Sequence, residues 1–152
     1  MSIWVLAFLI GVVAGLRSLT APAVVSWAAR LGWLHLQNTW LAFLGAPVTP
    51  WIVSVLALAE LVADQLPGTP SRKSPPGFGA RIVTGALCGG ALGASGGALV
   101  AGMIAGVLGA IVGTLGGYEA RVRAARAIGK DLPVALIEDA IAIGGALLIV
   151  WR

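Results

Sequence analysis

Arg17 is the residue whose type and position suggest chemistry most strongly in this sequence. It lies inside an apolar stretch, residues 3–27, that is long enough to cross a bilayer. A guanidinium at that depth needs a counter-charge or water, because an unpaired charge costs at least ~2.5–3.5 kcal/mol there. Ser18, Thr20 and Pro22 follow at once, so hydroxyl groups and a helix breaker accompany the charge. This combination is typical of an intramembrane solute or ion site.

Four carboxylates are candidate partners for Arg17. Glu60 and Asp64 are four residues apart, which places both on one face of a helix. Glu138 and Asp139 follow about one turn into the last apolar segment. A bundle that turns these faces inward pairs one guanidinium with up to four carboxylates, and we expect Glu60 to be the first partner and Glu138 the second.

Two interpretations of this charged set remain open. In the first, the ion pairs only fix the register of the helices, and Asp64 and Asp139 reach the membrane interface. In the second, Arg17 holds an anion or a counter-carboxylate in a polar cavity, while Glu60 or Glu138 takes up a proton or a cation.

Catalytic chemistry has little support in the sequence. The single histidine, His35, lies in a connection away from the carboxylates, and the single cysteine, Cys88, has small neighbours typical of packing. No metal-binding motif and no cofactor-binding motif is present, so we expect neither. Arg72 and Lys73 lie in a Pro/Gly-rich segment that is either a basic turn or a contact for lipid head groups.

The composition is that of an integral membrane protein. Of the 152 residues, 59% are hydrophobic and only 11% are charged, and the mean hydropathy is +0.97. Helix-length apolar runs favour an all-α bundle over a β-barrel. The net charge of +4 does not indicate nucleic-acid binding, because the basic residues are scattered through connecting segments. They are more typical of residues that orient a chain in the membrane, and membrane lipids are its expected surroundings.

We predict a single transmembrane domain, residues 1–152, that is a compact bundle of five helices. The first helix exceeds the length of one crossing, so it is expected to tilt or break near Pro22. The apolar stretch from Ile82 to Gly117 would extend ~54 Å as one helix, so it must fold back, with 93–97 as the turn of a Gly-rich hairpin. The predicted spans are 3–29, 50–66, 82–95, 98–117 and 133–151.

Five spans place the two basic connections on one side of the membrane. By the positive-inside rule this side is cytoplasmic, and the N-terminus lies there too. Five of the six tryptophans then lie at the outer interface and only Trp4 at the inner one. The expected location is the bacterial inner membrane. The basic residues on the predicted cytoplasmic side are Arg72, Lys73, Arg81, Arg121, Arg123, Arg126 and Lys130.

Glycines recur at close to every fourth residue from Gly85 to Gly117. Small faces at this spacing let helices approach closely, either within the chain or between subunits of a homo-oligomer. Residues 11–32 and 109–129 have similar glycine and Ala-Ala-Arg spacing, which suggests a weak inverted repeat.

Two motifs add a family resemblance. Gly-Leu-Arg-Ser-Leu-Thr-Ala-Pro-Ala at 15–23 and Ala-Glu-Leu-Val-Ala-Asp-Gln-Leu-Pro-Gly-Thr-Pro-Ser-Arg at 59–72, followed by 80–86, are similar to a family of small bacterial membrane proteins with a domain of unknown function. The resemblance implies a helical membrane protein and no particular activity.

The function expected from these residues is passage of a small solute or ion, as a transporter or channel. The alternatives are a membrane enzyme or binding protein for a lipid head group, and a structural subunit of a membrane complex; a non-enzymatic role is favoured.

Overall fold

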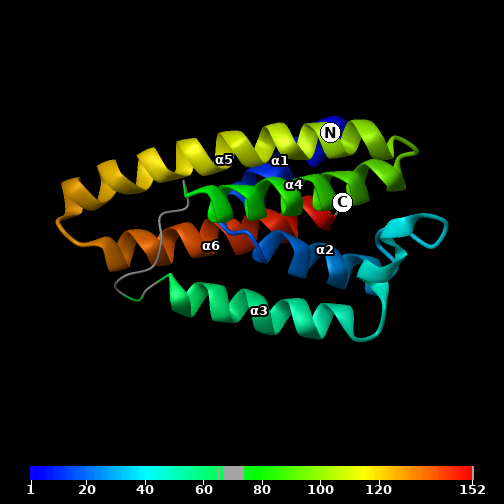
Figure 1. The fold of residues 1–152 in the computed structure, drawn as a ribbon, viewed down its shortest axis with the longest axis horizontal. Helices are drawn as coiled ribbons and strands as arrows, with labels where there is room; N and C mark the ends of the chain where they lie inside the picture. Colours follow the sequence, from blue (N-terminus) through cyan, green and yellow to red (C-terminus); the bar gives the residue numbers. More distant parts are fainter. Residues whose placement is uncertain (65, 67–73, 152) are drawn as a thin grey trace.

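The computed structural model describes residues 1–64, 66 and 74–151, and within them the chain is all-α, as predicted. The helices run roughly side by side in one elongated bundle (Figure 1). Six α-helices and one short 3-10 helix, with no strand, make up the described part of the chain. They are α1 (Ile3–Leu16), α2 (Thr20–Arg30), η1 (Trp40–Gly45), α3 (Thr49–Ala63), α4 (Pro75–Ser95), α5 (Leu99–Ile128) and α6 (Asp131–Val150).

Helices α1, α4 and α5 pack with their backbones nearly in contact. A Cβ atom on Gly89 would lie 2.7 Å from the Cα atom of Gly106, and one on Gly109 would lie 2.8 Å from the backbone nitrogen of Val12. Real Cβ atoms do not approach so closely, so only glycine fits. These faces are therefore occupied within one chain and are not left free for a second copy. The glycines that meet backbone in this way are Gly11, Gly15, Gly85, Gly89, Gly93, Gly102, Gly106, Gly109 and Gly113.

Helices α1 and α2 form a hairpin, and the expected single helix over 3–29 is wrong. Ile3 at the start of α1 lies against the turn between α4 and α5, because a Cβ atom on Gly96 would be 3.1 Å from its Cγ1 atom. After α2, the backbone N–H of His35 donates to the hydroxyl of Ser95 in the same turn, at 3.1 Å. The chain thus enters and leaves at one end of the bundle (Figure 1).

The interruption lies at Arg17–Leu19 and not near Pro22, which we predicted as the breaking point. Pro22 sits in the first turn of α2, where its missing N–H is harmless. The reversal also removes the inverted repeat, because α1 and α5 run parallel. Gly11 faces Gly106, and Gly15, one turn later, faces Ala110.

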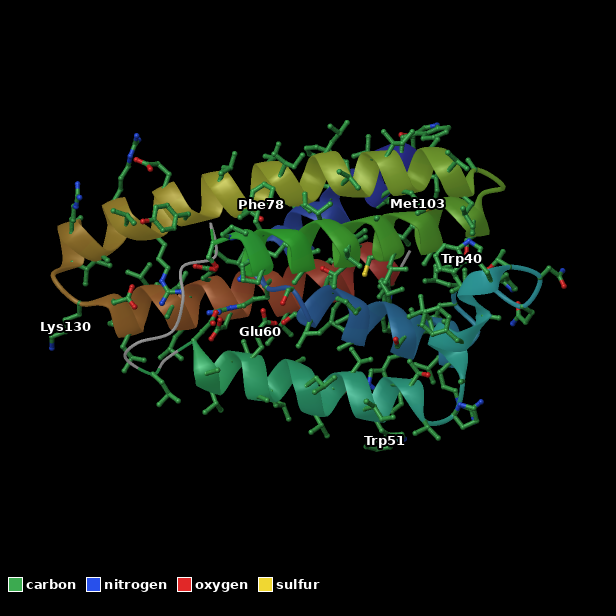
Figure 2. The ribbon with its side chains drawn as sticks, viewed as in Figure 1. Trp40, Trp51, Glu60, Phe78, Met103 and Lys130 are labelled. Atoms are coloured by element: carbon green, nitrogen blue, oxygen red, sulfur yellow. The ribbon has the colours of Figure 1, made fainter. Side chains whose placement is uncertain are left out.

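Trp40 and Trp51 lie at the end where the chain enters (Figure 2), and the positions of the other four tryptophans follow from their contacts and elements. Edge-to-face ring contacts, with centroids 5.0 and 5.3 Å apart, join Trp27 to Trp51 and Trp33 to Trp151. Trp4 belongs to the first turn of α1 and lies at this end as well. We refer to this end of the bundle as the tryptophan end.

The opposite end holds the turn between α5 and α6, the last turn of α3 and the first turn of α4 (Figure 2). Gly129, at φ +82°, ends α5, and Lys130 follows it. The expectation that the N-terminus shares a side with the basic connections is therefore wrong, because α1 starts at the tryptophan end. We refer to this opposite end as the basic end.

The remaining predicted spans agree with helices whose ends differ. Helix α3 covers most of 50–66. Helix α4 begins at Pro75, seven residues before the predicted start, because two prolines fit its first turn. Helix α5 continues past 117 to Ile128, since the alanines and arginines that follow are good helix formers. The turn expected at 93–97 lies slightly later, because α4 continues to Ser95 and the turn follows from Gly96, with Gly97 at φ +75°.

Helices α5 and α6 are long and apolar enough to cross a membrane, and α1 and α3 are shorter apolar helices. Large apolar side chains are exposed along both of the long helices, among them Val100, Ile104, Leu108, Leu136 and Leu148. This amount of exposed apolar surface is compatible with a lipid environment.

Candidate functional site

Glu60 of α3 holds the start of α2. In a continuous helix the N–H of Leu19 would donate to the carbonyl of Gly15. Here it donates to the Glu60 carboxylate at 2.8 Å, and the N–H and the hydroxyl of Ser18 donate to the same group at 2.9 and 2.6 Å. A carboxylate at this position also faces the positive end of the α2 dipole.

The carbonyl of Gly15, which would accept the N–H of Leu19 in a continuous helix, accepts hydrogen bonds from two side chains instead. The Arg81 Nε–H of α4 donates to it at 3.1 Å, and the Thr114 hydroxyl of α5 donates at 3.4 Å. Side chains from α3, α4 and α5 therefore replace one helical hydrogen bond at both of its ends. We call residues Arg17–Leu19, with these partners, the α1–α2 break.

Arg17 lies at the centre of the break and is completely buried. Its backbone is extended, with φ −139° and ψ 115°, which ends α1. The Nη1 atom pairs with Asp64 at the C-terminal cap of α3, and Nη2 pairs with Asp139 of α6. One guanidinium thus joins two carboxylates from different helices, which are 19% and 13% exposed.

The structure brings most of the predicted charged residues together but with different pairings. Our choice of Glu60 as the first partner of Arg17 and Glu138 as the second was wrong. The Glu60 carboxylate accepts hydrogen bonds from the start of α2. Asp64, one turn nearer the end of α3, is the residue that pairs with the guanidinium of Arg17.

The other predicted site residues have separate positions. The Thr20 side chain is buried in the first turn of α2, and its hydroxyl has no hydrogen-bond partner among the described residues. Arg72 and Lys73 lie outside the residues that the structure describes, so no position is assigned to them.

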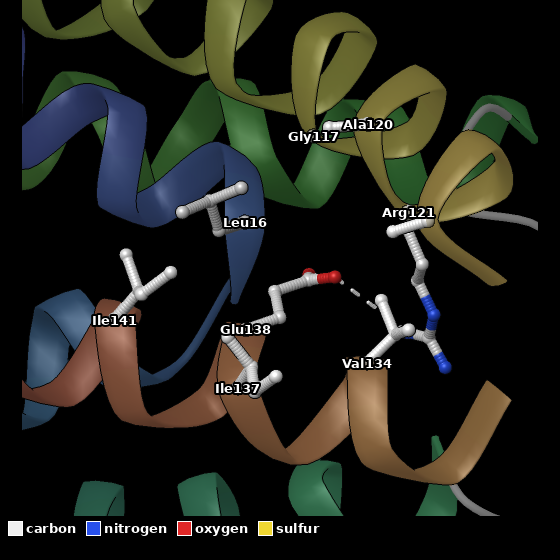
Figure 3. A pocket seen from close by; sticks show the side chains of 9 residues that line it. Leu16, Gly117, Ala120, Arg121, Val134, Ile137, Glu138 and Ile141 are labelled. Carbon is white, nitrogen blue, oxygen red and sulfur yellow. Dashed lines mark ion pairs between the residues drawn. The ribbon is translucent and has the colours of Figure 1, made fainter. Parts of the chain in front are cut away.

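Glu138 belongs to a second polar cluster beside the break. Arg121 donates to Asp131 through two hydrogen bonds of 3.1 and 2.8 Å, and its Nη1 atom is 3.9 Å from a Glu138 oxygen. Both Arg121 and Glu138 line a cavity of about 240 Å³ between the end of α1, α5 and α6 (Figure 3). The other lining side chains are apolar, among them Leu16, Ile137 and Ile141.

Sequence analysis missed Arg81 and Thr114 as members of the site. Both are polar side chains inside Gly-rich apolar segments, and both are buried, with exposed fractions of 6% and 0%. Their isolation among apolar residues was the available signal. It could not identify Gly15 as their common acceptor, because that contact depends on how three helices pack.

The chemistry that this geometry offers is ion pairing and hydrogen bonding. His35 is exposed near the tryptophan end, remote from the carboxylates, so it is not placed to activate a nucleophile among them. Within residues 1–64, 66 and 74–151, no three His, Cys, Asp or Glu side chains are grouped to hold a metal ion.

A comparison with protein families finds a match over nearly the whole chain. A family model described as "Domain of unknown function (DUF4126)" matches residues 4–151. The chain belongs to this family. The match extends from α1 through α6, so it includes every residue of the break, and the expected membership of a family with a domain of unknown function is confirmed. No curated protein and no solved structure matches the chain.

Proposed function

We propose that this protein is a multi-pass protein of the bacterial inner membrane that lets a small ion or solute pass. Helices α3–α6 cross the membrane, and α1 and α2 form a re-entrant hairpin that enters from the tryptophan end. The positive-inside rule makes the basic end cytoplasmic, and tryptophans commonly lie at the membrane interface. In this arrangement both chain termini lie on the outer side.

One observation carries the proposal of passage: the hairpin is interrupted at depth, and the interruption is surrounded by charged side chains from other helices. Irregular backbone inside a membrane is tolerated only where protein or a water-filled cavity surrounds it. Broken helices of this kind form the substrate and ion sites of many transporters. The Arg17–Asp64–Asp139 group has the ionisable residues that such sites require.

The charge balance favours a cation, including a proton, over an anion. Around the α1–α2 break, one buried guanidinium, that of Arg17, pairs with two carboxylates, those of Asp64 and Asp139, which are 19% and 13% exposed. A cation that enters next to Asp64 or Asp139 reduces the excess negative charge, whereas an anion increases it.

The test is flux into liposomes that contain the purified protein, with a pH-sensitive dye for protons and isotopes for alkali cations. The wild type should give flux above that of empty liposomes, and Asp139→Asn should abolish it. Glu119→Gln is the matched control, because Glu119 is 54% exposed and pairs with Arg123, one turn later in α5, at 3.2 Å. Wild-type flux equal to that of empty liposomes for all these ions would contradict the proposal.

A homo-oligomer remains part of the proposal. Since the glycine faces of α1, α4 and α5 are used within one chain, subunits would have to meet through other faces. Cross-linking in native membranes, followed by mass measurement in detergent, tests this point.

A further inference from the structure

We infer that the turn between α5 and α6 is a docking surface for the head groups of anionic phospholipids. This inference rests on the membrane setting of the proposed function but does not require that any ion passes. It follows from the pairing of the charges around this turn, from the apolar side chains beside them and from the length of α6. We call residues 126–132 the α5–α6 tip.

Both carboxylates near the tip have a guanidinium partner of their own. Asp131 accepts two hydrogen bonds from Arg121, of 3.1 and 2.8 Å. Glu119 pairs with Arg123, one turn later in α5, at 3.2 Å. These four residues are therefore close to neutral as a group.

Two cations of the tip are left over. Arg126, in the last turn of α5, and Lys130, just before α6, are both exposed, and within the described part of the chain neither side chain has an ion pair or a hydrogen bond. Residues 65 and 67–73 contain no Asp or Glu, so they supply no counter-charge either. Lys130 points away from the bundle at its outermost turn (Figure 2). Two such cations attract an anion from outside the chain.

Exposed apolar side chains flank these cations. Ile128 and Leu132 are 54% and 56% exposed, and each lies two residues from Lys130 in the sequence. An anionic bilayer surface matches this mixture, because it offers phosphates to the cations and acyl chains to the apolar side chains.

The length of α6 places the tip at the level of the lipid head groups. From Leu132 to Val150 the helix is ~28 Å long, which is close to the ~30 Å thickness of the hydrocarbon core. With α6 across the core, Leu132 lies at the boundary of the core, and Arg126 and Lys130 lie just outside it. The phosphates of the bilayer are then the nearest counter-charges, and no acidic protein is needed to supply them.

The experiment measures which lipid lies next to the tip. In a Cys88→Ala background, a fluorophore is attached at Ala127→Cys, and the protein is placed in phosphatidylcholine nanodiscs. A small share of the lipid is phosphatidylglycerol or phosphatidylcholine that carries a nitroxide near its head group. In the wild type, labelled phosphatidylglycerol should quench the fluorophore more strongly than labelled phosphatidylcholine does.

Substitutions at the tip should remove this preference. Each cation near a bilayer surface contributes about a fivefold preference for anionic lipid, so Arg126→Gln combined with Lys130→Gln should lower the preference by more than about fivefold. Both residues are exposed, so the variant should fold. Arg30→Gln is the matched control, because Arg30 is exposed as well but ends α2 near the tryptophan end.

Each outcome has a defined meaning. Equal quenching by the two labelled lipids in the wild type would overturn the inference and leave the tip to an acidic protein partner. An unchanged preference in the double variant, or an equal loss in Arg30→Gln, would overturn it too, because the tip would then not set the preference.

The wild type alone gives a second decision if the double variant does not fold. Its preference should fall when the salt concentration is raised about tenfold from low salt, because exposed charges are screened. A preference that salt does not change would contradict the inference. Preference for phosphatidylglycerol without flux would refute the proposed passage alone, whereas flux without this preference would refute this inference alone.

Discussion

The contact among α1, α4 and α5 and the contact around the α1–α2 break fix the same hairpin by opposite means. In the first, glycines let backbones meet, and the contact depends on the absence of side chains. In the second, Arg17 and its carboxylate partners fill the space, and the contact depends on charge. The comparison shows why α1 can end inside the bundle: the glycines hold α1 against α5, while the charged residues satisfy the backbone that its end exposes.

The glycine contact should be the most sensitive to added volume. We predict that Gly106→Leu prevents folding, because its Cβ atom would overlap the Gly85 carbonyl oxygen and lie 3.0 Å from Gly89 Cα. Gly116→Leu is the matched control in the same helix, since an added Cβ there meets nothing within 4 Å. Yield and elution volume in detergent measure the effect. A monodisperse, wild-type-like Gly106→Leu protein would show that the backbones are not in contact.

The charged contact should fail in a different way, through loss of a partner. Arg17→Leu leaves Asp64 and Asp139 without their guanidinium, and we expect the free energy of unfolding to fall by about 3–5 kcal/mol. Adding Asp64→Asn and Asp139→Asn should recover most of this loss, because the uncompensated charges are removed. Equilibrium unfolding in mixed micelles measures it.

The control for that prediction uses the partners expected from the sequence. Arg17→Leu combined with Glu60→Leu or Glu138→Leu should show no recovery. Recovery with either of these, and none with the two aspartate substitutions, would mean that the pairing around Arg17 is different from the one described.

The smallest effect is expected at the start of α2. Glu60→Ala removes the acceptor of the Ser18 and Leu19 N–H groups and should cost about 1–2 kcal/mol, the magnitude of a helix cap in contact with the dipole. Glu60→Gln keeps one oxygen acceptor and should lie between this variant and the wild type. If Glu60→Ala unfolds no more easily than the exposed control Glu119→Ala, Glu60 does not stabilise the break.

The parts of the fold that depend on local sequence could be predicted. The long apolar segments predicted the all-α class. The glycines at 93–97 predicted a turn, because glycine can adopt the positive φ that Gly97 has. Candidate charged residues could be found as well, since a charge in an apolar segment needs a partner wherever the chain goes.

The break itself could not be located from local sequence. Pro22 looked like the breaking residue but fits the first turn of a helix. Ser18 and Leu19 leave the helical pattern because their N–H groups donate to Glu60, which is 42 and 41 residues away in the sequence. For the same reason, spacing placed Glu60 and Asp64 on one face but could not decide which reaches Arg17. Which of the two carboxylates reaches Arg17 depends on how far α3 is shifted along its axis relative to the α1–α2 hairpin.

The most direct test of the central claim, that α1 and α2 reverse at Arg17–Leu19 within the membrane, is the sidedness of single cysteines. The native Cys88 is 1% exposed and can be replaced by alanine. In that background, Ser2→Cys and Asn38→Cys should be labelled by an impermeant maleimide from the same side, and Ser74→Cys and Arg126→Cys from the other. Labelling of Ser2→Cys and Asn38→Cys from opposite sides would show that residues 3–29 cross the membrane once, and would contradict the hairpin and the site built on it.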